Sequence, residues 1–197
     1  MTKQELRILY KQKRKELTAR EVAIKTDLIL INFQKIDLPF LSVAHTYVAS
    51  QKLGEVETFH LIEFLKFQNP GIKILVPKVD LASGKMEHFH FQEDTEMIEN
   101  FYGIAEPSTG IKISPEEIDL VLDPLLAFDK NGYRVGYGKG YYDKFLEECR
   151  EDVIKIGLSL FEPEEQIDDR KQFDIRLNYC VTPEDVYLFK SRSKFIS

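Results

Sequence analysis

The chain has 197 residues, of which 43% are hydrophobic and 30% are charged, and its formal net charge is −6. This length accommodates one large α/β domain or two small ones, and the composition is typical of a soluble globular protein. The negative charge argues against a dedicated nucleic-acid-binding protein, because such a domain carries a basic surface over most of its extent.

The N-terminus lacks the apolar core of a signal peptide, and no apolar run reaches the length of a membrane span. Cys149 and Cys180 are far apart and show no metal-ligand spacing, which favours free thiols in a reducing compartment. We therefore expect a cytoplasmic monomer that binds neither membranes nor nucleic acid. Because the chain has no internal repeat and no Gly/Ser linker, we expect a single domain over residues 1–197.

The first forty residues predict two helices. Residues 2–16 are rich in good helix formers, and their apolar positions recur at helical spacing. Thr18-Ala19-Arg20-Glu21 has the form of a capping box, which predicts a second helix from there to the break at Asp37-Leu38-Pro39. Basic residues dominate the first twenty positions, which fits either a local anion site or a solvated helix face.

The rest of the chain predicts strands that alternate with helices. Strands are expected over residues 42–49, 72–77, 86–91, 118–124, 153–160, 179–182 and 186–189, and helices over residues 59–67 and 141–150. Pro77 is expected to close its strand, and residues 93–117 are expected to form a long irregular connection. This alternation predicts a three-layer αβα fold with an open, largely parallel sheet.

Residues 129–143 are the most informative stretch and read DKNGYRVGYGKGYYD. Glycines at three of the five positions 136–140 remove the β-carbon, so backbone N–H groups can approach a ligand closely. Arg134 and Lys139 add positive charge, and a helix is predicted to start directly afterwards. Unpaired N–H donors and the helix dipole both favour an anion there, so we expect the loop to bind phosphate.

Two common phosphate-binding motifs do not fit this stretch. A P-loop needs Ser or Thr after its lysine, whereas Lys139 is followed by Gly140. The dinucleotide-binding fingerprint needs a third glycine at the position of Tyr141. Taken alone, alternating glycines are equally typical of tight turns.

The whole stretch closely resembles the signature of the 5-formyltetrahydrofolate cyclo-ligases, also called 5,10-methenyltetrahydrofolate synthetases. The resemblance extends over most of the chain, in matching order and at the expected distances. The further matching positions are Lys3 and Arg7 with Arg14 beyond them, Glu55-Val56-Glu57-Thr58, Glu106-Pro107, Asp119-Leu120-Val121-Leu122-x-Pro124 and Asp174. Members carry Tyr or Arg at the position of Tyr137, and the chain departs from common family residues at Leu125 and Asn178.

The resemblance implies an activity. Members of this family use ATP and Mg²⁺ to convert 5-formyltetrahydrofolate (folinic acid) into 5,10-methenyltetrahydrofolate, with release of ADP and phosphate. The γ-phosphoryl group of ATP activates the formyl oxygen, N10 then attacks the formyl carbon, and phosphate leaves. Such chemistry needs a protein that positions reactants and neutralises charge, without a nucleophilic Ser or Cys.

The resemblance also implies site residues. The ATP-binding residues are Lys3, Gln4, Glu5, Leu6, Arg7, Arg134, Val135, Gly136, Tyr137, Gly138, Lys139, Gly140, Tyr141 and Tyr142. The catalytic residues among them are Arg134, Lys139 and Tyr142. The folate-binding residues are Val48, Glu55, Tyr137, Gly138, Lys139, Gly140 and Tyr141. The magnesium ligands are Asp143 and Asp174.

Each of these residues also has a simpler interpretation. Lys3 and Arg7 are compatible with a solvated helix face, Asp143 with a carboxylate in a first helical turn, and Asp174 with an ordinary surface acid. Two other functions also remain open. One is a different enzyme on a similar fold, such as a sugar-phosphate isomerase or a CoA transferase, and the other is a non-catalytic nucleotide-binding module. Glu55 distinguishes the cyclo-ligase interpretation from both alternatives, because neither alternative needs an acidic group positioned for a pterin.

Overall fold

The computed structural model describes residues 1–80, 84–100 and 103–189. The helices are α1 (Lys3–Glu16), α2 (Ala19–Phe33), α3 (Phe59–Gln68) and α4 (Tyr141–Glu148), with short 3₁₀ turns at η1 (Gln51–Leu53) and η2 (Pro115–Glu117). The main-sheet strands are β1 (Val43–His45), β2 (Lys73–Asp80), β3 (Lys85–His90), β6 (Leu120–Pro124), β9 (Ile154–Leu158), β10 (Tyr179–Val181) and β11 (Val186–Leu188). Two further pairs are β4 (Met97–Glu99) with β5 (Ala105–Pro107) and β7 (Ala127–Phe128) with β8 (Arg134–Val135).

The main sheet has seven strands in the order β11-β10-β9-β6-β1-β2-β3. The five inner strands are parallel to one another, and β3 and β11 add antiparallel edges. After β1 the chain continues to β2, on one side of the adjacent β1–β6 pair. After β6 it continues to β9 and β10, on the opposite side of that pair. The carboxyl ends of β1 and β6 therefore border a topological switch point, where ligands bind in open α/β sheets.

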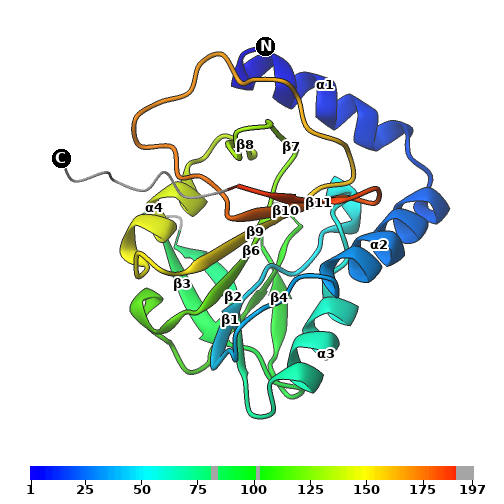
Figure 1. Cartoon of the computed structure of the whole chain (residues 1–197). Helices are drawn as coiled ribbons and strands as arrows, with labels where there is room; N and C mark the ends of the chain where they lie inside the picture. The colour runs from blue at the N-terminus through cyan, green and yellow to red at the C-terminus, as the bar shows by residue number, and fades with distance from the viewer. Residues whose placement is uncertain (81–83, 101–102, 190–197) are drawn as a thin grey trace.

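Helices cover both faces of this sheet (Figure 1). On one face, residues of α2 and α3 such as Phe33 and Leu65 pack against strand residues such as Leu122. On the other face, Phe145 of α4 packs with Val121. α1 instead lies over the β7–β8 pair, at the carboxyl end of the strands (Figure 1). The predicted three-layer αβα fold with a largely parallel sheet is confirmed.

Local sequence signals set the N-terminal helices as predicted. Both α1 and α2 begin at a capping box, in which Thr2 pairs with Glu5 and Thr18 pairs with Glu21. α2 ends at Phe33, before the predicted break at residues 37–39. Within the described residues, no helix is long and apolar enough to cross a membrane.

Two strand predictions were wrong in their extent. The strand expected over residues 42–49 ends at His45, because Tyr47 bonds to a later segment: Thr58 donates to its carbonyl at 2.8 Å. Pro77 does not close its strand, and β2 continues to Asp80 with Pro77 opposite His88. β1 ends opposite Leu75, so position 77 has no parallel partner that needs its missing N–H group.

Short strand pairs occupy segments for which no strand was predicted. β4 and β5 pair within residues 93–117, which were expected to form one irregular connection. β7 and β8 pair just before the glycine loop, with Phe128 opposite Arg134. These short strands lack the runs of apolar and β-branched residues that marked the strands predicted elsewhere in the chain.

Candidate active site

The glycine loop, defined here as Gly136–Gly140, connects β8 to α4 at the switch point of the sheet. A buried carboxylate fixes the turn that precedes this loop. Asp129 is fully buried, and its Oδ1 accepts the N–H groups of Asn131 at 2.9 Å and Tyr133 at 3.1 Å. Its Oδ2 accepts the N–H group of Ile167 at 3.0 Å. Asp129 therefore supports the loop and does not face a ligand.

Arg7 of α1 lies directly against the glycine loop. Its Nε donates to the Gly136 carbonyl at 3.0 Å. Gly138 has φ +98°, and a β-carbon added there would lie 3.1 Å from Arg7 Nε and 3.3 Å from Cζ. Glycine at this position thus satisfies both the backbone conformation and the close approach of the arginine. The structure brings the two basic segments predicted from sequence into one place.

Replacing Gly138 with Ala is expected to lower stability by about 1–2 kcal/mol, because a β-carbon at this φ is strained and displaces Arg7. For a chain of this length, the loss corresponds to a fall in Tm of roughly 3–6 °C. Gly136→Ala is the matched control, because Gly136 has a negative φ and a β-carbon added there would meet only open space. Thermal unfolding of both variants tests this prediction, and equal shifts would contradict it.

The end of the loop leaves helix donors available. Gly140 is the N-cap of α4, and no side chain makes a capping hydrogen bond to this helix start. N–H groups of a first helical turn without a cap are suited to an anion. Lys139 is exposed beside them. This end of the loop therefore combines backbone donors with a cation on a long, flexible side chain.

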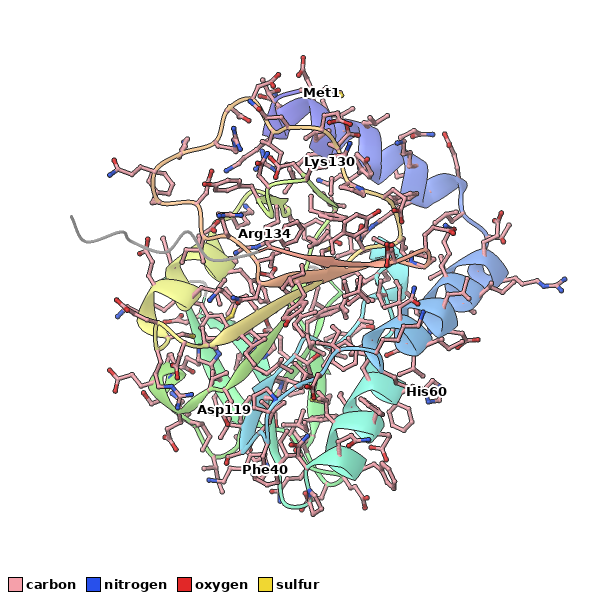
Figure 2. The ribbon with its side chains drawn as sticks, in the orientation of Figure 1. Met1, Phe40, His60, Asp119, Lys130 and Arg134 are labelled. Carbon is pink, nitrogen blue, oxygen red and sulfur yellow. The ribbon has the colours of Figure 1, made fainter. Side chains whose placement is uncertain are left out.

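Arg134, which is labelled in Figure 2, is in contrast buried. Its side chain is only 6% exposed. Its Nε pairs with Asp123 Oδ2 at 2.7 Å, its terminal nitrogens reach Asp143 Oδ1 at 3.2 Å, and they donate to the Ile175 carbonyl at 2.6 Å. Burial raises the pKa of the Asp123 carboxyl to about 7, although Arg134 acts in the opposite direction. The guanidinium thus holds β6, α4 and the segment before β10 together.

The two predicted magnesium ligands each have a cationic neighbour. Asp174 Oδ1 pairs with Lys3 Nζ at 2.6 Å, and its Oδ2 accepts the Lys171 N–H group at 2.6 Å. Asp143 is one third exposed, in the first turn of α4, and its Oδ1 pairs with Arg134 and accepts the Ile175 N–H group at 3.5 Å. Within the described residues, no group of three His, Cys, Asp or Glu side chains could hold a metal. Asp143 therefore keeps the greater capacity for a cation.

Glu55, which is predicted to bind the folate, lines a groove of about 710 Å³ that opens between α1, α2 and residues 49–57. Its Oε1 accepts the Tyr137 hydroxyl at 2.8 Å, and its Oε2 accepts the Ser50 N–H group at 2.9 Å. Burial raises the pKa of Glu55, and these two hydrogen bonds oppose that shift. Arg14 in turn donates to the Tyr137 oxygen at 2.9 Å.

Tyr142 points into the interior from the start of α4. Its ring contacts His45 and Phe145, with centroids 6.1 Å and 6.0 Å away. Its buried hydroxyl has no hydrogen-bond partner within the described part of the chain. Val48, also predicted at the folate site, is half-buried and follows β1 at the carboxyl end of the sheet.

Other residues predicted to bind ATP have structural surroundings of their own. Glu5 belongs to the capping box of α1, and Gln4 is exposed beside it. Leu6 and Val135 are fully buried and pack in one cluster. Their contact with nucleotide stays a prediction, and for Leu6 and Val135 it would have to involve the backbone.

With the geometry established, similarity to known proteins decides the family. Residues 1–172 match the 5-formyltetrahydrofolate cyclo-ligase family. The chain belongs to this family. A probable 5-formyltetrahydrofolate cyclo-ligase of Schizosaccharomyces pombe is 37% identical over 150 residues, covering 67% of this chain and 71% of the yeast protein. A 5-formyltetrahydrofolate cyclo-ligase of Haemophilus influenzae is 33% identical over 109 residues, covering 54% of this chain and 58% of that protein.

Solved structures agree with the fold of this cyclo-ligase family member. A 5,10-methenyltetrahydrofolate synthetase from Mycoplasma pneumoniae superposes with a TM-score of 0.73 at 26% identity, covering 93% of this chain and all of the other. The corresponding enzyme from Aquifex aeolicus gives a TM-score of 0.75 at 27% identity, covering 97% of this chain and 94% of the other. The resemblance inferred from sequence motifs is confirmed.

Two buried charges of the chain had no predicted role. Asp123 stands inside an otherwise apolar strand, and a charge at a buried position must be paired, so its position was a usable signal. Arg14 is 6% exposed, but it is one of several basic residues on α1. Its burial depends on segments far away in the sequence, so the charge pattern could not reveal it.

Proposed function

We propose that the chain catalyses the ATP- and Mg²⁺-dependent cyclisation of 5-formyltetrahydrofolate to 5,10-methenyltetrahydrofolate, with release of ADP and phosphate. One observation carries the proposal beyond family membership. Tyr137, in the middle of the glycine loop, donates a hydrogen bond to Glu55 at 2.8 Å. This contact supports the proposal, because the loop proposed to bind phosphate and the carboxylate proposed to bind the pterin must be adjacent if a phosphoryl group is to be transferred onto a folate.

The phosphate side of the proposed site combines several donors. N–H groups of the glycine loop and of the first turn of α4 would receive the ATP phosphates. Lys139, exposed beside them, supplies a positive charge that can follow the transferred group. Arg7 of α1 contacts Gly136 and Gly138 and would place a second positive charge beside the loop.

Magnesium would be held by Asp143 together with ATP phosphates and water, since Mg²⁺ commonly uses one or two protein carboxylates. Asp174 is the second predicted ligand, and it would have to exchange its pairing with Lys3 for the cation. When bound, Mg²⁺ neutralises charge on the phosphates. Arg134 would keep Asp143 at the start of α4 through its 3.2 Å contact.

The folate side of the proposed site depends on Glu55. Each carboxylate oxygen can accept about two hydrogen bonds. Tyr137 and Ser50 use one acceptor position on each oxygen. The remaining positions could accept the amino and ring N–H groups of a pterin, provided that the carboxyl is ionised. Both donors favour the ionised form against the effect of burial on the pKa.

The reaction needs activation of a poor leaving group. The formyl oxygen would take the γ-phosphoryl group of ATP, and ADP would leave. N10 then attacks the formyl carbon, the C–O bond breaks, and phosphate departs. The chain contributes alignment of the two substrates and charge neutralisation around the transferred phosphoryl group, because such transfers need little covalent participation by the protein.

The proposal is tested by mixing the purified protein with 5-formyltetrahydrofolate, ATP and Mg²⁺. We expect the cyclised folate, detected by a new near-ultraviolet absorbance, and ADP to appear together in equal molar amounts. Lys139→Ala should raise the KM for ATP more than the KM for the folate, because the predicted role of Lys139 is on the phosphate side. Absence of folate-dependent ADP release would rule out this function.

A further inference from the structure

Arg14 is a buried cation at a junction of segments distant in the sequence. From α1 it donates to the Tyr137 hydroxyl oxygen at 2.9 Å and to the Leu53 carbonyl at 3.2 Å. It also donates to the carbonyl of Leu125, just after β6. The glycine loop, the segment after β1 and the chain after β6 thus meet on a single guanidinium.

The chemistry of the guanidinium sets the direction of the hydrogen bonds. Arginine has only donors and stays protonated, so the Tyr137 oxygen accepts from Arg14. The hydroxyl proton of Tyr137 is then directed to its other neighbour, Glu55 Oε1. Donation by a charged group polarises the hydroxyl and strengthens the second bond of the chain.

This chain of hydrogen bonds restrains Glu55 from two sides. Tyr137 holds Oε1, and the Ser50 N–H group holds Oε2. Arg14 also acts on the carbonyl of Leu53, within the same segment that carries Glu55. The positive charge of Arg14 favours ionisation of Glu55 as well, although burial raises the pKa of that carboxyl.

We propose that Arg14 is a positioning residue for the folate: through Tyr137 it fixes the orientation of Glu55, the carboxylate that would bind the pterin. The inference rests on the proposed function and adds the residue that sets substrate recognition. Three of the four terminal N–H groups of Arg14 are used by Tyr137, Leu53 and Leu125, and the side chain is buried, so we assign it no contact with the phosphates. The glycine loop keeps its second anchor, Arg7, when Arg14 is changed.

The test compares Arg14→Met, Arg14→Lys, Tyr137→Phe and the double variant Arg14→Met/Tyr137→Phe. Arg14→Met is expected to raise the KM for 5-formyltetrahydrofolate by about tenfold, the equivalent of one lost hydrogen bond to a charged group, with the KM for ATP changed less than about threefold. Arg14→Lys should show the same selectivity, because a lysine ammonium cannot span three acceptors in a planar fork. Arg20→Met, which removes an exposed cation on α2, is the control.

The double variant separates positioning through Tyr137 from general support of the fold. If Arg14 acts through Tyr137, the double variant should have a folate KM close to that of the single variant with the higher folate KM. Additive effects, or equal increases in both KM values, would overturn the proposal. Should Arg14→Met fail to fold, Arg14→Lys with an unchanged folate KM would overturn it equally. A wild-type protein without folate turnover refutes the proposed function itself, whereas an active wild type with unaltered variants refutes only the role of Arg14.

Discussion

Replacing Glu55 with Gln is expected to raise the KM for 5-formyltetrahydrofolate by roughly 10²-fold, with little change in the KM for ATP. The amide has one acceptor oxygen in place of two, so its NH₂ group would face a donor, either the Ser50 N–H group or a pterin N–H group. Loss of the negative charge also removes two charge-assisted hydrogen bonds, each worth about 1.5–3 kcal/mol. Separate titrations of folate and ATP in the absorbance assay measure both KM values.

Glu57→Gln is the matched control for this variant. Glu57 is exposed two residues further along, and its Oε1 accepts the N–H groups of Thr58 and Phe59, which a glutamine oxygen could also accept. We expect both KM values of this control to stay within about twofold of wild type. A Glu55→Gln enzyme with the folate KM of the control would show that Glu55 does not bind the pterin.

Replacing Arg134 with Met is expected to lower the free energy of unfolding by about 3–5 kcal/mol, the usual cost of removing one partner of a buried ion pair. Asp123 is 1% exposed and Arg134 6%, so water cannot replace the lost cation. The carbonyl of Ile175 also loses its donor. Arg150→Met is the control, because Arg150 is 42% exposed and pairs with two carboxylates at the surface. Such surface pairs contribute about 0–1 kcal/mol.

The loss of unfolding free energy caused by Arg134→Met should increase as the pH rises above 7. Burial raises the pKa of Asp123 to about 7 in the wild type, while Arg134 lowers it. A carboxyl with a raised folded-state pKa binds its proton more tightly in the folded state, so this group costs stability as the pH rises from its unfolded value to the folded one. In the wild type that loss ends near pH 7, whereas without Arg134 the folded pKa is higher and the loss continues.

Urea unfolding of wild type and Arg134→Met at pH 6 and pH 8.5 measures this difference. Below pH 7 the Asp123 carboxyl is mainly neutral in both proteins, so the smaller deficit there reflects the lost contacts to Ile175 and Asp143. A deficit that is the same at both pH values would mean that Asp123 does not carry a buried charge in the variant.

Much of the secondary structure followed from local sequence. The starts of α1 and α2 were predictable because a capping box uses residues three positions apart. α4 was predictable from the glycine loop before it and from its own apolar spacing. β1 and β2 were predicted with the wrong ends, because Tyr47 bonds to residues 56 and 58, and because Pro77 lies beyond the end of its parallel neighbour. Neither partner can be recognised from the nearby sequence.

The sequence by itself determined the family, the αβα class and the residue types at the phosphate loop. The αβα class follows from the alternation of strand and helix patterns along the chain, and the family follows from residues 129–143 together with matching positions elsewhere, all of which a linear pattern records. Only the tertiary structure decided which charges are buried and which groups they pair with. Arg134, whose contact with the phosphates stays a prediction, is paired with Asp123, whereas Arg14, one basic residue among several on α1, is joined to Glu55 through Tyr137. The free energy of a charge depends on burial and on its partners, and both come from segments brought together only by folding.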